Sequence, residues 1–142
     1  MTNLDTGCFV KLYYPEPDST KVVALIQGKP LCHTPLHELE FMNALQLKVF
    51  LKSATSAQVT AACALVEADL KAGVLVAPGG EWKDIFAEAV KLAEQHTGAI
   101  GCRSLDILHC AAARVLAASE FISTDARQKK LAVAMGLNLV TF

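Results

Sequence analysis

The chain alternates between short apolar runs and longer segments of helical periodicity, and this alternation most restricts its fold. The short runs lie at residues 3–4, 30–33, 74–76, 121–123 and 139–140, and each is soon followed by a carboxylate, a hydroxyl or a turn residue. Strands that are separated by helices pair in parallel, because right-handed crossovers return the chain to the same sheet. We therefore predict an α/β three-layer sandwich, with a mostly parallel central sheet of four to five strands flanked by helices.

The predicted helices fill the intervals between these strands. Ala and Leu dominate their sequences, and Gly or Pro separates them from their neighbours. They cover residues 35–52, 56–72, 82–96, 104–118 and 126–135, and Gly136 ends the last of them. A further helix, containing Phe9 and Val10, follows the first strand if Asp5 is its N-cap.

The 142 residues, 1–142, are expected to form one domain, because 53% of them are hydrophobic and these are spread along the chain. The longest apolar stretches are shorter than the roughly 20 residues that span a bilayer. Five cysteines lie apart from one another, without the close pairs of zinc or redox sites and without a secretory leader before them. We expect a soluble, cytoplasmic protein with reduced cysteines and no membrane association.

The charge balance says little about partners. The formal net charge is −1, which is not the electrostatic footprint of a dedicated nucleic-acid-binding protein. A nuclease that grips a short single-stranded segment needs only a local basic rim, so this class stays open. Aromatic residues make up 6% of the chain, which argues against a platform for stacking bases.

Glu40 interrupts an apolar arc of the helix predicted at residues 35–52. At about 100° per residue, the same arc of the helix holds Leu36, Ala44, Leu47 and Leu51. A carboxylate on an apolar arc needs a partner. We expect Glu40 to be functional, with Asn43 one turn along as a hydrogen-bond donor to it.

Asp106 and His109 interrupt the helix predicted at residues 104–118, which is otherwise apolar nearly all round, as buried helices are. Asp106 has two interpretations: a functional carboxylate, or a first-turn acid stabilised by the helix dipole with Ser104 as the cap. For His109 the favoured interpretation is a core histidine that makes one hydrogen bond.

Asp5 and Asp125 both follow predicted strands. Taken alone, each is explained by helix capping, and Asp125 with Gln128 three residues later has the pattern of a capping box. Their common placement favours function, because ligands of parallel sheets bind beyond the carboxyl ends of the strands.

Asp5, Glu40, Asp106 and Asp125 are therefore expected to converge on one edge of the sheet. Their mutual repulsion would prevent full ionisation without a cation. Ligands that are all oxygen atoms select Mg²⁺ or Mn²⁺ rather than zinc. Such a centre polarises a phosphoryl oxygen and activates water, which suits the hydrolysis of phosphodiesters.

The motifs around these acids resemble those of the PIN-domain nucleases, and most closely the VapC-type toxin subunits of toxin–antitoxin pairs. LDT at residues 4–6 followed by VKLY at 10–13 is similar to the first motif of the family, and LE at 39–40 followed by NAL at 43–45 to the second. The most specific likeness is RSLDILHCAAA at 103–113 followed by FISTDARQ at 121–128.

The resemblance implies a PIN-like fold and a metal-dependent endoribonuclease. It implies that the Mg²⁺ or Mn²⁺ ligands are Asp5, Glu40, Asp106 and Asp125. It also implies that Thr124 or Ser123 helps to orient the scissile phosphate. The expected partners are structured RNA, a second copy of the chain and a cognate antitoxin whose tail covers the active site.

Basic residues near the same edge are candidates for contacts with RNA phosphates, although ordinary solvated charges explain each one singly. They are Arg103 and Arg127, together with Lys11, Arg114, Lys129 and Lys130. The chain departs from the family at Gly7, where a small hydroxyl or amide residue usually stands, and it thereby lacks one side-chain donor beside Asp5.

Other functions fit the sequence less well. Asp5-Thr6-Gly7 matches the triplet of aspartic proteases, but those enzymes have mostly β folds and this chain is largely helical. A phosphoaspartate receiver lacks support because no lysine follows a late strand. The serious alternative is a catalytically inactive PIN-like module that binds RNA or a protein partner.

Overall fold

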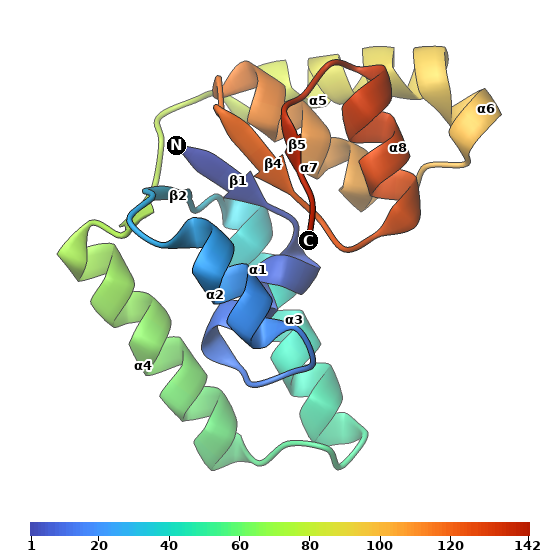
Figure 1. Cartoon of the computed structure of the whole chain (residues 1–142). Helices are drawn as coiled ribbons and strands as arrows, with labels where there is room; N and C mark the ends of the chain where they lie inside the picture. The colour runs from blue at the N-terminus through green and yellow to red at the C-terminus, as the bar shows by residue number, and fades with distance from the viewer.

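A five-stranded parallel sheet forms the centre of the molecule, in the strand order β3-β2-β1-β4-β5. The computed structural model describes residues 1–142 (Figure 1). Its strands are β1 (Thr2–Leu4), β2 (Leu31–Cys32), β3 (Leu75–Val76), β4 (Glu120–Ile122) and β5 (Leu139–Val140). The predicted α/β fold with a parallel sheet is confirmed.

Helices cover both faces of this sheet. Those of the first half of the chain are α1 (Thr6–Tyr13), α2 (Ser19–Ile26), α3 (Pro35–Phe50) and α4 (Ser56–Ala72). Those of the second half are α5 (Trp82–Leu92), α6 (Gly98–Ile100), α7 (Ser104–Val115) and α8 (Ala126–Ala134). Figure 1 shows α1 to α4 on one side of the strands and α5, α7 and α8 on the other.

Two hydrophobic cores lie on the two sides of the sheet, because successive side chains of a strand point to opposite faces. In β4, Ile122 packs into the core formed with α1 to α4, whereas its neighbour Phe121 packs into the core formed with α5, α7 and α8. Both side chains are fully buried. This alternation establishes the predicted three-layer arrangement.

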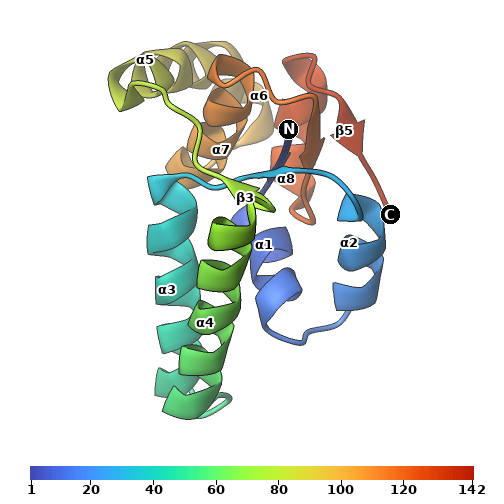
Figure 2. The same cartoon turned by 90° about the vertical axis from the view of Figure 1, so that its left-hand side faces the viewer.

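The long helices α3 and α4 extend well beyond the sheet (Figures 1 and 2). Thr34 caps α3 and Thr55 caps α4, each with a reciprocal capping box. Near the far end of α3 the sheet no longer offers a packing surface, and Leu47, Phe50 and Leu51 are exposed there.

Three local predictions need correction. Helix α2 was not predicted, because its eight residues are too few for a clear periodicity and follow a segment rich in turn residues, YPEPDS at 14–19. The helix predicted at 82–96 ends its regular α part at Leu92 and continues as a π-helical turn over Ala93–Thr97. Ser104 is the first residue of α7 and does not cap it, since the N-cap is Arg103.

All five cysteines are free, as predicted. Cys8, Cys32 and Cys110 are buried, and burial raises the pKa of each of these thiols. No helix has the length and apolar character needed to cross a bilayer.

Replacement of Phe9 tests the core beneath the sheet. Its ring is fully buried and lies 5.2 Å from the ring of Tyr13 and 5.4 Å from that of Phe41. We expect Phe9→Ala to lower the free energy of unfolding by about 3–5 kcal/mol, because it leaves a cavity. The matched variant Phe50→Ala, at a side chain that is 79% exposed, should change it by less than about 0.5 kcal/mol. Urea denaturation followed by circular dichroism measures both, and equal effects would contradict this description of the core.

Candidate active site

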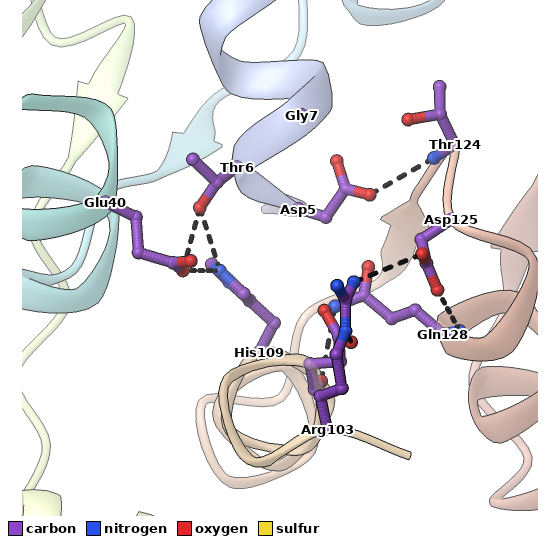
Figure 3. Close-up of a pocket in the computed structure, with 10 residues that line it drawn as sticks. Asp5, Thr6, Gly7, Glu40, Arg103, His109, Thr124, Asp125 and Gln128 are labelled. Atoms are coloured by element: carbon purple, nitrogen blue, oxygen red, sulfur yellow. Dashed lines mark hydrogen bonds and ion pairs between the residues drawn. The ribbon is translucent and has the colours of Figure 1, made fainter. Parts of the chain in front are cut away.

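A polar pocket of about 370 Å³ opens beyond the carboxyl ends of β1 and β4 (Figure 3). No hydrophobic side chain lines it. Its lining residues are Asp5, Thr6, Gly7, Glu40, Arg103, Asp106, His109, Thr124, Asp125 and Gln128. All four predicted acids therefore face one pocket, although they are spread over 120 residues of sequence, from position 5 to position 125.

Asp5 is held at the end of β1 by a set of donors. Its Oδ1 accepts the backbone N–H of Cys8 at 2.7 Å, so Asp5 caps α1 as expected. Its Oδ2 accepts the hydroxyl of Ser123 and, at 3.1 Å, the backbone N–H of Thr124. Only 5% of Asp5 is exposed, and these donors compensate for the loss of water around the carboxylate.

Ser123 links the two strand-end aspartates. Its hydroxyl donates to Asp5 and accepts the backbone N–H of Asp125 at 3.0 Å. The residue is fully buried, so it positions these two acids from behind the pocket. Of the two hydroxyls predicted to orient a phosphate, only that of Thr124 belongs to a residue of the pocket wall.

Gly7 leaves room for Thr124. A Cβ atom at position 7 would lie 3.2 Å from the Thr124 hydroxyl oxygen, which is closer than ordinary van der Waals contact. The bonds to Asp5 come from Cys8, Ser123 and Thr124, and none of them needs a side chain at position 7. The departure from the family at this position therefore leaves Asp5 well held.

Glu40 belongs to a network with Thr6 and His109. Its Oε1 lies 2.6 Å from His109 Nε2 and accepts the Thr6 hydroxyl at 2.9 Å (Figure 3). An ionised carboxylate only accepts hydrogen bonds, so the bonding hydrogen lies on Nε2. Burial raises the pKa of Glu40, but the hydrogen bond and charge of His109, with smaller effects of Thr6 and Arg103, lower it overall.

The apolar arc on which the sequence analysis placed Glu40 is not the face of α3 that is buried in the structure. Leu36 is buried, but Leu47 and Leu51 are exposed, and the buried face continues through His37, Phe41 and Leu45. Asn43 is exposed and makes no hydrogen bond to Glu40. Glu40 nevertheless reaches the pocket, because it lies beside the buried face rather than within it.

His109 was interpreted as a core histidine with one hydrogen bond; it is indeed buried and bonds through one ring nitrogen, Nε2, but it also belongs to the pocket. Its side chain is buried, yet it lines the pocket and contacts Glu40 and Thr6. The available signal was its spacing of three from Asp106, which places both residues on one face of α7.

His37 supports the strand end that carries Asp5, a role that the sequence analysis did not predict. Its Nε2 donates to the carbonyl oxygen of Leu4 at 2.7 Å, and its Nδ1 accepts the backbone N–H of Thr34 at 3.1 Å. Burial, reinforced by the charges of His109 and His33, lowers the pKa of His37 to about 3. It is therefore neutral at physiological pH, as these two bonds require.

Asp106 and Asp125 share a cation from their own chain. Arg103 donates from Nε to Asp106 at 2.8 Å and from Nη2 to Asp125 at 3.3 Å. The other oxygen of Asp125 accepts the backbone N–H of Gln128 at 2.8 Å. The predicted capping box is only half formed, because the Gln128 side chain donates instead to the backbone carbonyl of Asp106.

The other basic residues near this edge lie outside the pocket. Lys11 pairs with Glu16, and Arg114 pairs with Glu88. Arg127 is exposed and does not line the pocket. The pocket wall thus contains one arginine, Arg103.

The donors suit a divalent metal by their chemistry, since four carboxylates supply only oxygen atoms. As placed, no three His, Cys, Asp or Glu side chains form a group that could hold an ion. Arg103 supplies the positive charge between Asp106 and Asp125. The chemistry of the four carboxylates therefore fits a divalent metal, while in their present placement two of them are paired with Arg103.

The network around Glu40 predicts how this residue titrates. In His109→Leu the carboxyl stays buried but loses its strongest partner, so its pKa should rise above that of the wild type and it should take up its proton at higher pH. Thr6→Val should give a smaller rise. His109→Leu should fold, because His109 Nδ1 is buried without a partner and a leucine removes that unpaired atom. NMR titration of the Glu40 side-chain carboxyl carbon measures both shifts, and an unchanged pKa in His109→Leu would refute this network.

Comparison with known proteins agrees with the fold. A search among curated proteins gives no significant match. Among solved structures, the chain is similar to a structure described as FitAcB from Neisseria gonorrhoeae, with a TM-score of 0.66 and 14% sequence identity. The similarity covers 99% of this chain and 97% of that one, which supports the likeness of fold along the whole length.

The family model of the PIN domain matches residues 3–134, which include all of β1 except Thr2, β2 to β4, α1 to α8 and all four acids of the pocket. PIN domains are in general nucleases that use divalent metals. The chain belongs to the PIN domain family.

Proposed function

We propose that the protein is a Mg²⁺- or Mn²⁺-dependent endoribonuclease and the toxin of a toxin–antitoxin pair. The observation that carries the catalytic part is the convergence of Asp5, Glu40, Asp106 and Asp125 on one wholly polar pocket. Membership of the PIN family supports hydrolysis of a nucleic acid. The choice of RNA and the role as a toxin rest on the resemblance of the motifs.

The four carboxylates are the proposed metal ligands, and their oxygen chemistry favours Mg²⁺ or Mn²⁺. When bound, the metal supplies a polarised phosphoryl oxygen and a water of lowered pKa. His109 is not among the proposed ligands, because its Nε2 already donates to Glu40 and its Nδ1 is buried.

The surrounding residues hold the ligands in place. Ser123 and the N–H groups of Cys8 and Thr124 orient Asp5, while Thr6 and His109 fix one oxygen of Glu40. The second oxygen of Glu40 accepts none of these bonds, so it remains available. The Thr124 hydroxyl stands at the pocket wall, where we place the scissile phosphate.

The proposed partners are a cognate antitoxin and a second copy of the chain. The resemblance supplies both, and the exposed apolar side chains are compatible with them. Leu39, Leu47 and Phe50 of α3, and Leu51 at its C-cap, are all more than half exposed, which is unusual for large apolar side chains of one helix. Light scattering coupled to gel filtration measures whether the isolated chain forms a dimer.

Removal of one carboxylate tests the catalytic proposal. Asp106 lies in the first turn of α7, and Asp84 lies in the first turn of α5, where it is exposed. We expect Asp106→Asn to reduce cleavage of total RNA by about a thousandfold, since loss of a metal ligand costs several kcal/mol of transition-state stabilisation. Asp84→Asn changes the same charge at an equivalent helix position and should leave the rate unchanged. Chelation of the metal should stop cleavage by the wild type.

Gel analysis of RNA fragments, beside calorimetry with Mn²⁺, separates the possible outcomes. Fragments that depend on both the metal and Asp106 would support the nuclease. If the wild type binds RNA and no Mn²⁺, and cuts nothing, the inactive binding module is the correct description. Cleavage that survives in Asp106→Asn would show that the nucleolytic site lies elsewhere.

A further inference from the structure

Arg103 stands where three of the four pocket acids can act on it. It forms ion pairs with Asp106 and Asp125. The hydrogen bond and charge of Asp106 raise the pKa of Arg103 most, and the charges of Asp125 and then Glu40 raise it further. Figure 3 shows its guanidinium directed into the pocket toward Asp125. It is the one arginine or lysine of the pocket wall.

The position of Arg103 is unfavourable apart from these acids. It is the N-cap residue of α7 and makes no side-chain bond to the helix. A cation at this end of a helix meets the positive end of the helix dipole. The two aspartates therefore account for the conformation of the side chain.

The same bonds are weak enough to break. The Arg103 side chain is 60% exposed, and ion pairs of exposed arginines contribute little to stability because water and salt screen them. Asp106 and Asp125 are more enclosed, with 16% and 30% of their side chains exposed. The guanidinium can thus leave for solvent while the two carboxylates stay in the pocket.

We propose that Arg103 is an internal counter-cation: its charge compensates those of Asp106 and Asp125 in the metal-free protein, and both ion pairs break when a divalent cation binds the two carboxylates. This proposal rests on the proposed metal centre and adds a competitor to it. Arg103 and the metal then exclude each other from the same carboxylate oxygens. The metal must overcome the two ion pairs before it binds, so Arg103 sets the metal concentration at which the pocket fills.

The opposite role for Arg103 makes the opposite prediction. If the guanidinium served to position Asp106 and Asp125 for the metal, its removal would loosen the ligands and weaken binding. If it acts as a competitor, its removal strengthens binding. The sign of the change in metal affinity therefore decides between the two roles.

Calorimetric titration of the whole chain with Mn²⁺ alone makes this test, with wild type, Arg103→Gln and Arg127→Gln. We expect Arg103→Gln to bind Mn²⁺ roughly fivefold more tightly, as the loss of two modest ion pairs implies. Arg127→Gln removes the same charge near the same edge without touching the pocket acids, and its affinity should match that of the wild type.

Thermal unfolding gives an independent readout. In chelator, Arg103→Gln should melt below the wild type, because the acids then repel each other without a counter-cation. Saturating Mn²⁺ should raise its melting temperature by more than it raises that of the wild type.

Equal or weaker Mn²⁺ binding by Arg103→Gln would overturn the inference and leave the metal centre intact. Absence of Mn²⁺ binding by both proteins would instead overturn the proposed metal-dependent function, and the inference with it. Tighter binding in Arg103→Gln without any RNA cleavage would support the inference and reject the nuclease.

Discussion

The parallel pairing of β1 with β4 holds residues from the two ends of the chain in one sheet, and the pocket exists because of it. The register places Leu4 beside Ile122, and the N–H of Asp5 bonds to the Ile122 carbonyl oxygen at 2.9 Å. The chain leaves both strands at the same edge and immediately enters α1 and α8, whose N-caps are Asp5 and Asp125. A strand end, a helix start and an acidic side chain thus coincide twice at the same edge of the sheet.

Helix capping by Asp125 is compatible with the role that we propose for it, since a carboxylate has two oxygens. Asp125 gives Oδ1 to the N–H of Gln128 and Oδ2 to Arg103. Glu40 likewise concentrates its bonds to Thr6 and His109 on one oxygen. Asp125 and Glu40 are therefore each anchored through one oxygen and direct the other to the pocket, whereas both oxygens of Asp5 accept hydrogen bonds from the protein.

The sequence was sufficient where chemistry and periodicity coincide, and insufficient where packing decides. Strand-end positions placed Asp5 and Asp125 correctly, and the alternation of strands and helices predicted the sheet. The helical arc of Glu40 failed in detail, because α3 extends past the sheet and leaves Leu47 and Leu51 in solvent. The contact of His109 with the pocket was not predicted, because nothing in the sequence around a buried histidine identifies its hydrogen-bond partner. That partner, Glu40, lies 69 residues away. Helix α2 was missed because eight residues carry too little periodic signal.

The central place of β4 also bears on how the protein is made. Residues 120–125 are synthesised more than 100 residues after β1, yet β4 lies between β1 and β5, and Asp125 and Ser123 complete the pocket from there. A nascent chain that has not released this segment from the ribosome lacks one proposed ligand and the hydroxyl that orients another. Completion of the pocket is thereby coupled to folding of the chain as far as Asp125, because β4 must pair with β1 before the strand-end acids come together.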